Sequence, residues 1–268
     1  MSYLKGGQMA LEYAPLGLVG LLTPQANTTV EPEAWALLPN GYSLVNARMV
    51  SQAANLNDRL LDYVNHVERS VSQFSNAPLS VLSLACTGSS YLMGQETETR
   101  WVQTWQQRLR IPVVTAGLAV VQALRSLNAR RIDLVSPYPE DLTKASVAYW
   151  TSYGFDVGEV KAVRISEQGF HPIYQTCTEA ATLATEELSQ SRADAVLMLG
   201  TGMPTLNTLL ANRGRFGPPV LSCMLALIWQ SVMSSHSAQA KDSDLSSFRA
   251  WMDARHWASR AQAMGMNT

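Results

Sequence analysis

Three short apolar segments, each ending in small or turn residues, occur twice in this sequence and in the same order. In the first match, residues 16–22 run into Thr23-Pro24 and residues 131–135 run into Ser136-Pro137. In the second, residues 81–85 run into Cys86-Thr87-Gly88 and residues 195–199 run into Gly200-Thr201-Gly202. In the third, residues 112–115 match residues 219–222. The offsets between matched ends are 113, 114 and 107 positions. Three matches at nearly constant spacing indicate an internal repeat, and therefore two similar half-domains.

The segments between these ends have helical patterns, and strands that alternate with helices predict parallel α/β structure. A chain of 268 residues suits two lobes of roughly 110 to 130 residues each. The predicted fold is α/β, with two pseudo-twofold-related half-domains, each a parallel sheet flanked by helices. We expect the half-domains at residues 14–125 and 126–235, and a C-terminal helical segment at 236–268 that packs back on the first.

Ligands of open parallel sheets collect at the carboxyl ends of the strands. All matched ends lie there, so they are expected to converge on one cleft between the lobes. One helix is predicted to begin at Thr28, Thr29 or Glu31 and to end at residue 38, and others are predicted at residues 53–74, 145–153, 178–188 and 246–264. The last carries Trp251 and Trp257 and is predicted to contact the core or a second copy, which leaves a homo-oligomer open.

The composition excludes several classes of function. Lys and Arg number 20 against 21 Asp and Glu, without a basic cluster, so nucleic-acid binding is not expected. The N-terminus lacks the pattern of a signal peptide, and the apolar run at 220–229 is too short to cross a bilayer. A cytoplasmic protein without membrane contact is expected. No glycine-rich phosphate motif and no CxxC pair occurs, so neither a nucleotide cofactor nor a metal is implied.

Cys86 is the candidate catalytic residue. It follows a buried strand and precedes Thr87-Gly88-Ser89, which is predicted to begin a helix. Backbone N–H groups and the helix dipole stabilise a thiolate at such a position, so a lowered pKa is expected. A thiolate of this kind acts as base or nucleophile and, once protonated, as acid. The alternative is a buried structural cysteine.

The turns after two matched strands are candidates for binding a carboxylate or an enediolate. Thr87, Gly88 and Ser89 supply hydroxyl and backbone N–H donors, and the turn Gly200-Thr201-Gly202 supplies similar donors from the other lobe. These residues can also be ordinary helix caps. Cys177 and Cys223 fall in predicted helices and are interpreted as core residues. Candidates for the apolar pocket lining are Tyr42, Val45, Tyr91 and Met203.

The segment 22–33, with Pro24-x-x-Asn27-Thr28-Thr29, resembles the start of maleate cis-trans isomerases of the aspartate/glutamate racemase superfamily. The resemblance implies that Asn27 contacts the substrate carboxylate. Ser136-Pro137-Tyr138 is similar to the family's second-lobe strand end, whose tyrosine hydroxyl contacts carboxylate. The resemblance covers roughly residues 14–229, and implies an enzyme without metal or organic cofactor that acts on a small mono- or dicarboxylate.

Two further residues lie where this family presents a polar side chain to the substrate, in the loop after the strand predicted at 160–165. Gln168 is one candidate. His171 is the other, to pair with a second carboxylate or tune the thiol, although capping the helix that begins near Thr176 explains it equally well.

The sequence departs from the family pattern at Gly200. Maleate isomerases and racemases of this superfamily place a cysteine on each side of the substrate, at positions matching Cys86 and Gly200. The related arylmalonate decarboxylases keep only the second-lobe cysteine, so this chain resembles their mirror arrangement.

A single thiol favours a reaction that delivers a proton to one face. The preferred prediction is therefore decarboxylation of a substituted (aryl)malonate, with the enediolate bound by the two turns and protonated by Cys86. The main alternative is cis-trans isomerisation of a maleate-like diacid with Cys86 as nucleophile. A further alternative is a binding protein that holds a carboxylate without catalysis.

Overall fold

The computed structural model describes residues 11–163, 172–215, 217–235 and 244–265, and contains two four-stranded sheets in which every strand pair is parallel. The first sheet has the order β2-β1-β3-β4 and the second β6-β5-β7-β8. The strands are β1 (Gly17–Pro24), β2 (Tyr42–Met49), β3 (Val81–Leu84), β4 (Val113–Thr115), β5 (Arg131–Ser136), β6 (Asp156–Ala162), β7 (Ala195–Met198) and β8 (Val220–Ser222).

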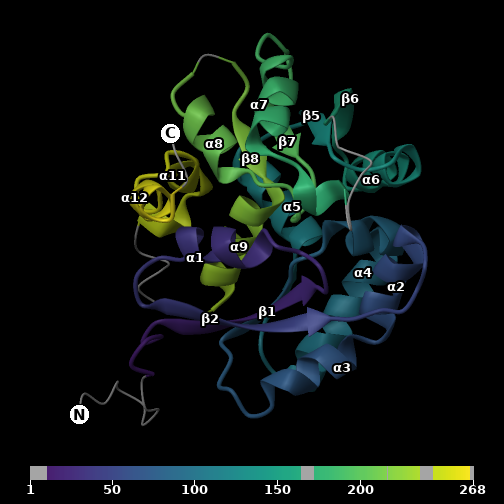
Figure 1. Ribbon diagram of the computed structural model, residues 1–268, viewed down its shortest axis with the longest axis vertical. Helices are drawn as coiled ribbons and strands as arrows, with labels where there is room; N and C mark the ends of the chain where they lie inside the picture. The colour runs from purple at the N-terminus through teal and green to yellow at the C-terminus, as the bar shows by residue number, and fades with distance from the viewer. Residues whose placement is uncertain (1–10, 164–171, 216, 236–243, 266–268) are drawn as a thin grey trace.

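The two sheets have the same order of strands when the numbers of the second are lowered by four. The strand ends matched in the sequence belong to β1 and β5, β3 and β7, and β4 and β8, which are equivalent positions in the two sheets. The predicted α/β architecture of two similar half-domains is confirmed. Figure 1 shows β1 and β2 of the first sheet, in purple and blue, below β5 to β8 of the second, in teal and green.

Helices connect the strands, as parallel pairing requires. They are α1 (Val30–Leu37), α2 (Leu56–Asn65), α3 (Val67–Val71), η1 (Ser72–Phe74), α4 (Thr87–Leu109) and α5 (Ala116–Ser126) in the first lobe, and α6 (Glu140–Ser152), η2 (Pro172–Gln175), α7 (Thr178–Glu186), α8 (Leu206–Asn212), α9 (Cys223–Ser234), η3 (Asp244–Ser246), α11 (Phe248–Met252) and α12 (Ala258–Ala263) thereafter.

Two predicted helices are divided in the structure. The prediction at 53–74 becomes α2, α3 and η1, and the prediction at 246–264 becomes η3, α11 and α12. The second division falls at Ala254, whose φ of 55° lies in the left-handed region and ends the helical geometry.

The helices that follow β4 and β8 begin with the same type of capping hydrogen bond. Thr115 caps α5 by accepting a hydrogen bond from the N–H of Leu118, and Ser222 caps α9 by accepting one from the N–H of Leu225. A hydroxyl at this position satisfies a helix N–H that would otherwise be unpaired. The repeat therefore extends from sequence to capping chemistry.

The helix α9 joins the lobes. It follows the last strand of the second sheet, yet it packs against β1, β3 and β4 of the first sheet and against α5. The Ser231 hydroxyl lies 2.7 Å from the Ser83 hydroxyl of β3. In Figure 1, α9 lies between the two lobes, close to α1 and to α11. The exact borders of the half-domains stay a prediction.

In the part of the chain that the structure describes, no helix has the length and apolar character needed to cross a membrane.

Candidate active site

The carboxyl ends of the strands of both sheets meet at the boundary between the lobes. The Thr201 hydroxyl, after β7, donates a hydrogen bond of 2.7 Å to the carbonyl of Ala85, after β3. The turn that contains Cys86 and the turn that contains Gly200 are therefore in direct contact at the boundary between the lobes, where the sequence places them.

Cys86 is the N-cap of α4, and its side chain is buried, with an exposed fraction of 3%. The Ser89 hydroxyl lies 3.2 Å from the Cys86 sulfur and 2.8 Å from the carbonyl of Leu60. Its single proton serves only one of these acceptors at a time. The backbone N–H groups of Gly88 and Ser89 also face the sulfur. The predicted position at a helix N-terminus is thus present.

The predicted lowering of the Cys86 pKa is wrong for this structure. Burial raises the pKa of the thiol above its ordinary value, and the Ser89 hydroxyl and the N–H groups of Ser89 and Gly88 offset this only in part. The helix N-terminus was visible in the sequence, whereas the depth of burial results from packing of the second lobe and α2. At neutral pH the sulfur therefore carries its proton.

The hydroxyls of Thr87 and Tyr138 form a contact across the lobes at 3.0 Å. Burial raises the pKa of Tyr138 well above its ordinary value, so its hydroxyl is a neutral hydrogen-bond donor. Gly88 allows the close approach of α4 to α2, because a Cβ there would lie 2.7 Å from Leu60 Cδ1. The Cys86 thiol and the hydroxyls of Thr87, Ser89 and Tyr138 therefore lie together in one corner of the boundary between the lobes, and none of these side chains is charged.

The Gly200 turn differs from the Cys86 turn in its backbone. Gly200 has a φ of 86°, and α8 begins only at Leu206, after Pro204. The end of β3 therefore leads directly into a helix, whereas the end of β7 does not. The Thr201 hydroxyl is engaged with Ala85, and the ring of Tyr174 packs on Gly202, where a Cβ would lie 2.3 Å from a ring carbon.

Asn27 is buried at the boundary between the lobes, with an exposed fraction of 1%. Its Oδ1 accepts hydrogen bonds from the N–H groups of Thr29 and Val30, at 2.8 and 3.0 Å, and so caps α1. Its Nδ2 donates to the carbonyl of Thr201 at 3.2 Å. In this structure the side chain links the first lobe to the Gly200 turn, and its role toward a substrate stays a prediction.

Several other predicted residues do not join this corner. Gln168 and His171 lie outside the described residues. Tyr42 opens β2, at the edge of the sheet opposite the strand ends. Cys177 is exposed at the N-cap of α7, so its interpretation as a core residue is wrong. Among the residues that the structure describes, no three His, Cys, Asp or Glu side chains cluster as metal ligands.

Cys223 lies in the buried core, as the sequence interpretation expected, and it also lies close to the Cys86 corner. It is fully buried, as a core residue would be, but it is the first residue of α9 and lies directly after β8. Its sulfur is 3.4 Å from the carbonyl of Met198 and faces the N–H of Gly200 and the hydroxyls of Thr87 and Tyr91. The criterion that selected Cys86, a cysteine directly after a strand end, also selects Cys223.

Glu33 lies at a second contact between the lobes, beside a cavity of about 240 Å³ that Thr28, Tyr174 and Pro204 also line. Its buried carboxyl group accepts hydrogen bonds from the hydroxyl of Thr205 and the N–H of Leu206, at the N-terminus of α8. Burial raises the pKa of Glu33 to about 7, and the bonds from Thr205 and Leu206 oppose this rise.

Comparison with known proteins gives consistent matches over most of the chain. A model of the arylmalonate decarboxylase family matches residues 19–245. The maleate isomerase of Geobacillus stearothermophilus is 24% identical over 230 residues, which are 81% of this chain and 90% of that protein. The maleate isomerase of Nocardia farcinica is 29% identical over 221 residues, which are 78% of this chain and 86% of that protein.

A solved structure of the maleate cis-trans isomerase of Nocardia farcinica has a TM-score of 0.70 and 26% sequence identity, and covers 81% of this chain and 92% of that chain. In that structure one cysteine is replaced by serine, and a succinylcysteine intermediate is covalently bound.

Proposed function

The chain belongs to the arylmalonate decarboxylase family, and we propose that it isomerises a small cis-unsaturated diacid such as maleate, with Cys86 as the nucleophile. Its similarity to maleate isomerases supports this choice of reaction. The chain is an enzyme of the branch of the racemase superfamily that contains arylmalonate decarboxylases and maleate isomerases. We propose isomerisation rather than decarboxylation as its reaction.

The observation that carries the proposal is the position of the Cys86 sulfur. It lies in the first lobe at the N-terminus of α4, with two backbone N–H groups and the Ser89 hydroxyl facing it. These donors stabilise negative charge on the sulfur when it ionises and again when it leaves. The likeness to maleate isomerases, one of which forms a succinylcysteine, supports the same choice.

The reaction requires no oxidation, reduction or external group. The Cys86 thiol first releases its proton to water, and the ionised sulfur adds to one olefinic carbon. A C–S bond forms, and the π electron pair moves onto the neighbouring carbon and its carboxylate as an enediolate. The central bond is then single and rotates. The electron pair returns, the C–S bond breaks, and the trans diacid leaves with the Cys86 thiolate restored.

The hydroxyls of Thr87 and Tyr138 are suited to the charge that develops in this step. They lie 3.0 Å apart, one from each lobe, and both are neutral donors close to Cys86. Preorganised donors of this kind stabilise an enediolate more than they stabilise the ground-state carboxylate. Hydroxyl groups from both lobes would therefore stabilise the enediolate of the isomerisation.

Decarboxylation is a second candidate, and the raised pKa of Cys86 favours it. A neutral thiol is a proton donor. One C–C bond of a malonate breaks, carbon dioxide leaves, the electron pair remains as an enediolate, and the S–H proton moves to the carbon. The thiol lies in the lobe opposite to that of the usual decarboxylases, so protonation of the opposite face is expected.

The test uses the purified full chain with maleate and, separately, with phenylmalonate. Proton NMR follows fumarate, and a gas assay follows carbon dioxide. We expect fumarate from the wild type and none from Cys86→Ala, while Cys177→Ser, at an exposed cysteine, keeps the wild-type rate. Carbon dioxide without fumarate would select the second candidate, and its product from an aryl-methylmalonate should then be a single enantiomer. Fumarate formation by Cys86→Ala at the wild-type rate would overturn both candidates.

A further inference from the structure

We infer that Cys223 is a second acid–base thiol of the same cleft, which protonates and deprotonates the substrate carbon next to the one that Cys86 attacks. The inference rests on the proposed isomerisation. It assigns a chemical role to a residue whose sequence context is an apolar helix.

The first observation is the position of Cys223 in the second sheet. β7 and β8 are neighbouring parallel strands, with Met198 paired to Ser222. Gly200 follows the end of β7 and Cys223 follows the end of β8, so both lie at the carboxyl edge of one sheet. The Cys223 sulfur faces the N–H of Gly200, which offers no side chain of its own. A thiol is thus present at the second-lobe wall of the cleft, one strand away from Gly200.

The second observation is that the two thiols share their neighbours. Thr87, the residue after Cys86, interacts through its hydroxyl with the Cys223 sulfur and with the Tyr138 hydroxyl. Both sulfurs are close enough to Tyr138 to affect its pKa. A substrate that displaced the contact between Thr87 and Tyr138 would therefore lie next to both thiols.

The third observation is an unpaired polar group at the same place. The Tyr91 hydroxyl is buried and makes no hydrogen bond among the described residues, although the side chain is 4% exposed. It faces the Thr87 hydroxyl and the Cys223 sulfur. A buried hydroxyl without a partner costs free energy, and a bound carboxylate or enediolate would supply the missing acceptor.

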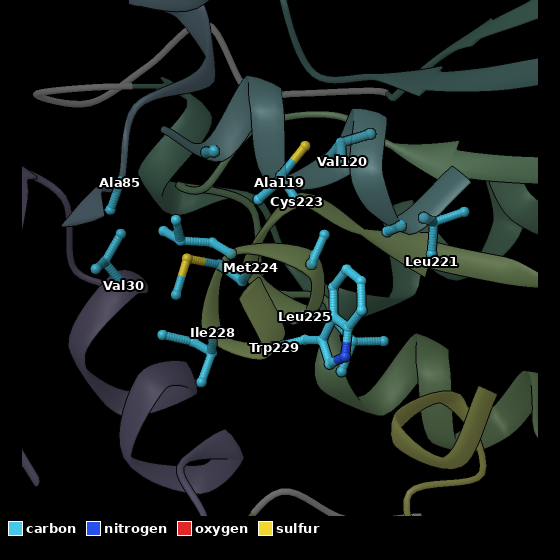
Figure 2. Close-up of a cluster of buried hydrophobic side chains, with 14 of the residues drawn as sticks. Val30, Ala85, Ala119, Val120, Leu221, Cys223, Met224, Leu225, Ile228 and Trp229 are labelled. Atoms are coloured by element: carbon cyan, nitrogen blue, oxygen red, sulfur yellow. The ribbon is translucent and has the colours of Figure 1, made fainter. Parts of the chain in front are cut away.

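The direction of the Cys223 side chain agrees with this role. Figure 2 shows Cys223 at the start of α9 within the buried apolar cluster, with its sulfur pointing away from Ile228 and Trp229 of the same cluster. The absence of a side chain at Gly200 keeps the adjoining space for the Tyr138 hydroxyl, because a Cβ there would lie 3.0 Å from that oxygen.

The chemistry balances with the two thiols. After Cys86 has added, the neighbouring carbon holds the electron pair, and the S–H proton of Cys223 moves to it. The product is a succinyl thioether on Cys86 and a thiolate at Cys223. After rotation about the central bond, that thiolate removes a proton from the same carbon, the double bond re-forms and the C–S bond breaks. Burial raises the pKa of Cys223 to about 12, so its thiol keeps the proton until a strong base such as a carbanion accepts it.

The experiment is isomerisation of maleate in deuterium oxide. A proton transfer at carbon places deuterium in the fumarate, whereas addition, rotation and elimination without Cys223 leave the product unlabelled. We expect labelled fumarate from the wild type. In Cys223→Ser we expect a rate lowered by roughly 100-fold or more, the usual size of a general acid–base contribution. Water can still supply a proton to the carbon in Cys223→Ser, but no thiolate is present to remove one, so a succinyl adduct on Cys86 should accumulate, detectable by intact-protein mass spectrometry and peptide mapping.

Cys177→Ser is the matched control, since it changes an exposed cysteine and should keep the wild-type rate and labelling. Circular dichroism and thermal unfolding show whether Cys223→Ser is folded, and Cys223→Ala provides a second variant. Unlabelled fumarate from the wild type would overturn this inference alone, as would wild-type rates in both Cys223 variants. Failure of the wild type to form fumarate would overturn the proposed isomerisation and this inference with it.

Discussion

The side-chain amide of Asn27 donates a hydrogen bond to the carbonyl of Thr201, 174 residues further along the chain, at 3.2 Å. The Oδ1 of the same amide caps α1 through the N–H groups of Thr29 and Val30. One buried side chain thus both begins a helix of the first lobe and ties that lobe to the turn after β7. Asn27 therefore stabilises the contact between the lobes, although it lies outside the turns that contain Cys86 and Gly200.

Asn27→Ala should lower the free energy of unfolding by about 1 to 3 kcal/mol, since it removes a helix cap and a buried hydrogen bond between the lobes. Asn27→Asp should cost at least as much, because its carboxylate still accepts from the N–H groups of Thr29 and Val30 but is buried and faces the Thr201 carbonyl without a donor. Urea denaturation of both variants measures this order. Equal stability of Asn27→Ala and wild type would contradict the bridging role.

Alkylation of Cys86 by iodoacetamide should be slow near neutral pH and should accelerate as the pH rises. The pKa of its thiol is raised, so the thiolate fraction at pH 7 is below that of an ordinary cysteine. Mass spectrometry of the Cys177→Ser protein, which lacks the exposed thiol, gives the rate at each pH. A rate that is already constant between pH 6 and 8 would mean that the pKa is low and that burial does not dominate.

Glu33→Gln should remove part of the dependence of stability on pH. The folded-state pKa of Glu33 is about 7, above its value of 4.5 in the absence of burial, so the folded protein binds a proton more tightly than the unfolded chain. This contribution is fully present below about pH 4.5 and is lost as the pH rises through 7. It amounts to about 3 kcal/mol at most, at roughly 1.4 kcal/mol per pH unit.

Urea denaturation of Glu33→Gln and wild type at several pH values checks this, because the amide is neutral throughout and its oxygen still accepts hydrogen bonds. The stability of the variant relative to wild type should rise between pH 4.5 and 7. The exposed Glu12→Gln is the control. A constant difference between Glu33→Gln and wild type across this range would show that the Glu33 pKa is not raised.

Gly200→Ala should be more destabilising than Gly214→Ala. Both glycines have positive φ, 86° and 72°, which costs an alanine about 1 to 2 kcal/mol. Only at Gly200 would the added Cβ also approach the Tyr138 hydroxyl, at 3.0 Å, whereas Gly214 has open space around it. Thermal unfolding of the pair measures the difference. Equal losses would mean that the Tyr138 hydroxyl moves away without cost.

The repeat of strand ends was enough to predict that β1 is equivalent to β5, β3 to β7 and β4 to β8, because all six strands are largely buried and have apolar sequences. It did not reveal that β2 and β6 are also equivalent. These strands are at the edges of their sheets and are partly exposed, so polar residues such as Asn46, Glu159 and Lys161 interrupt the pattern.

The features of the site that depend on neighbouring residues in the sequence could be predicted, whereas those that depend on packing between distant elements could not. A cysteine after an apolar run and before Thr87 predicts a helix N-terminus, which the structure contains. The pKa of that cysteine depends on burial by elements distant in the sequence, including Leu60 of α2. The apolar residues after Cys223 predicted a core residue, and its burial confirms this, although its place directly after β8 was also visible in the sequence.

The position of α9 bears on how the protein is made. Residues 223–234 cover strands β1, β3 and β4, which are translated more than a hundred residues earlier. While the ribosome is still adding the second lobe, one face of the first sheet has no native cover and exposes apolar side chains. The half-domain that is synthesised first is therefore completed last, and a nascent chain that stalls before α9 is the species most in need of a chaperone.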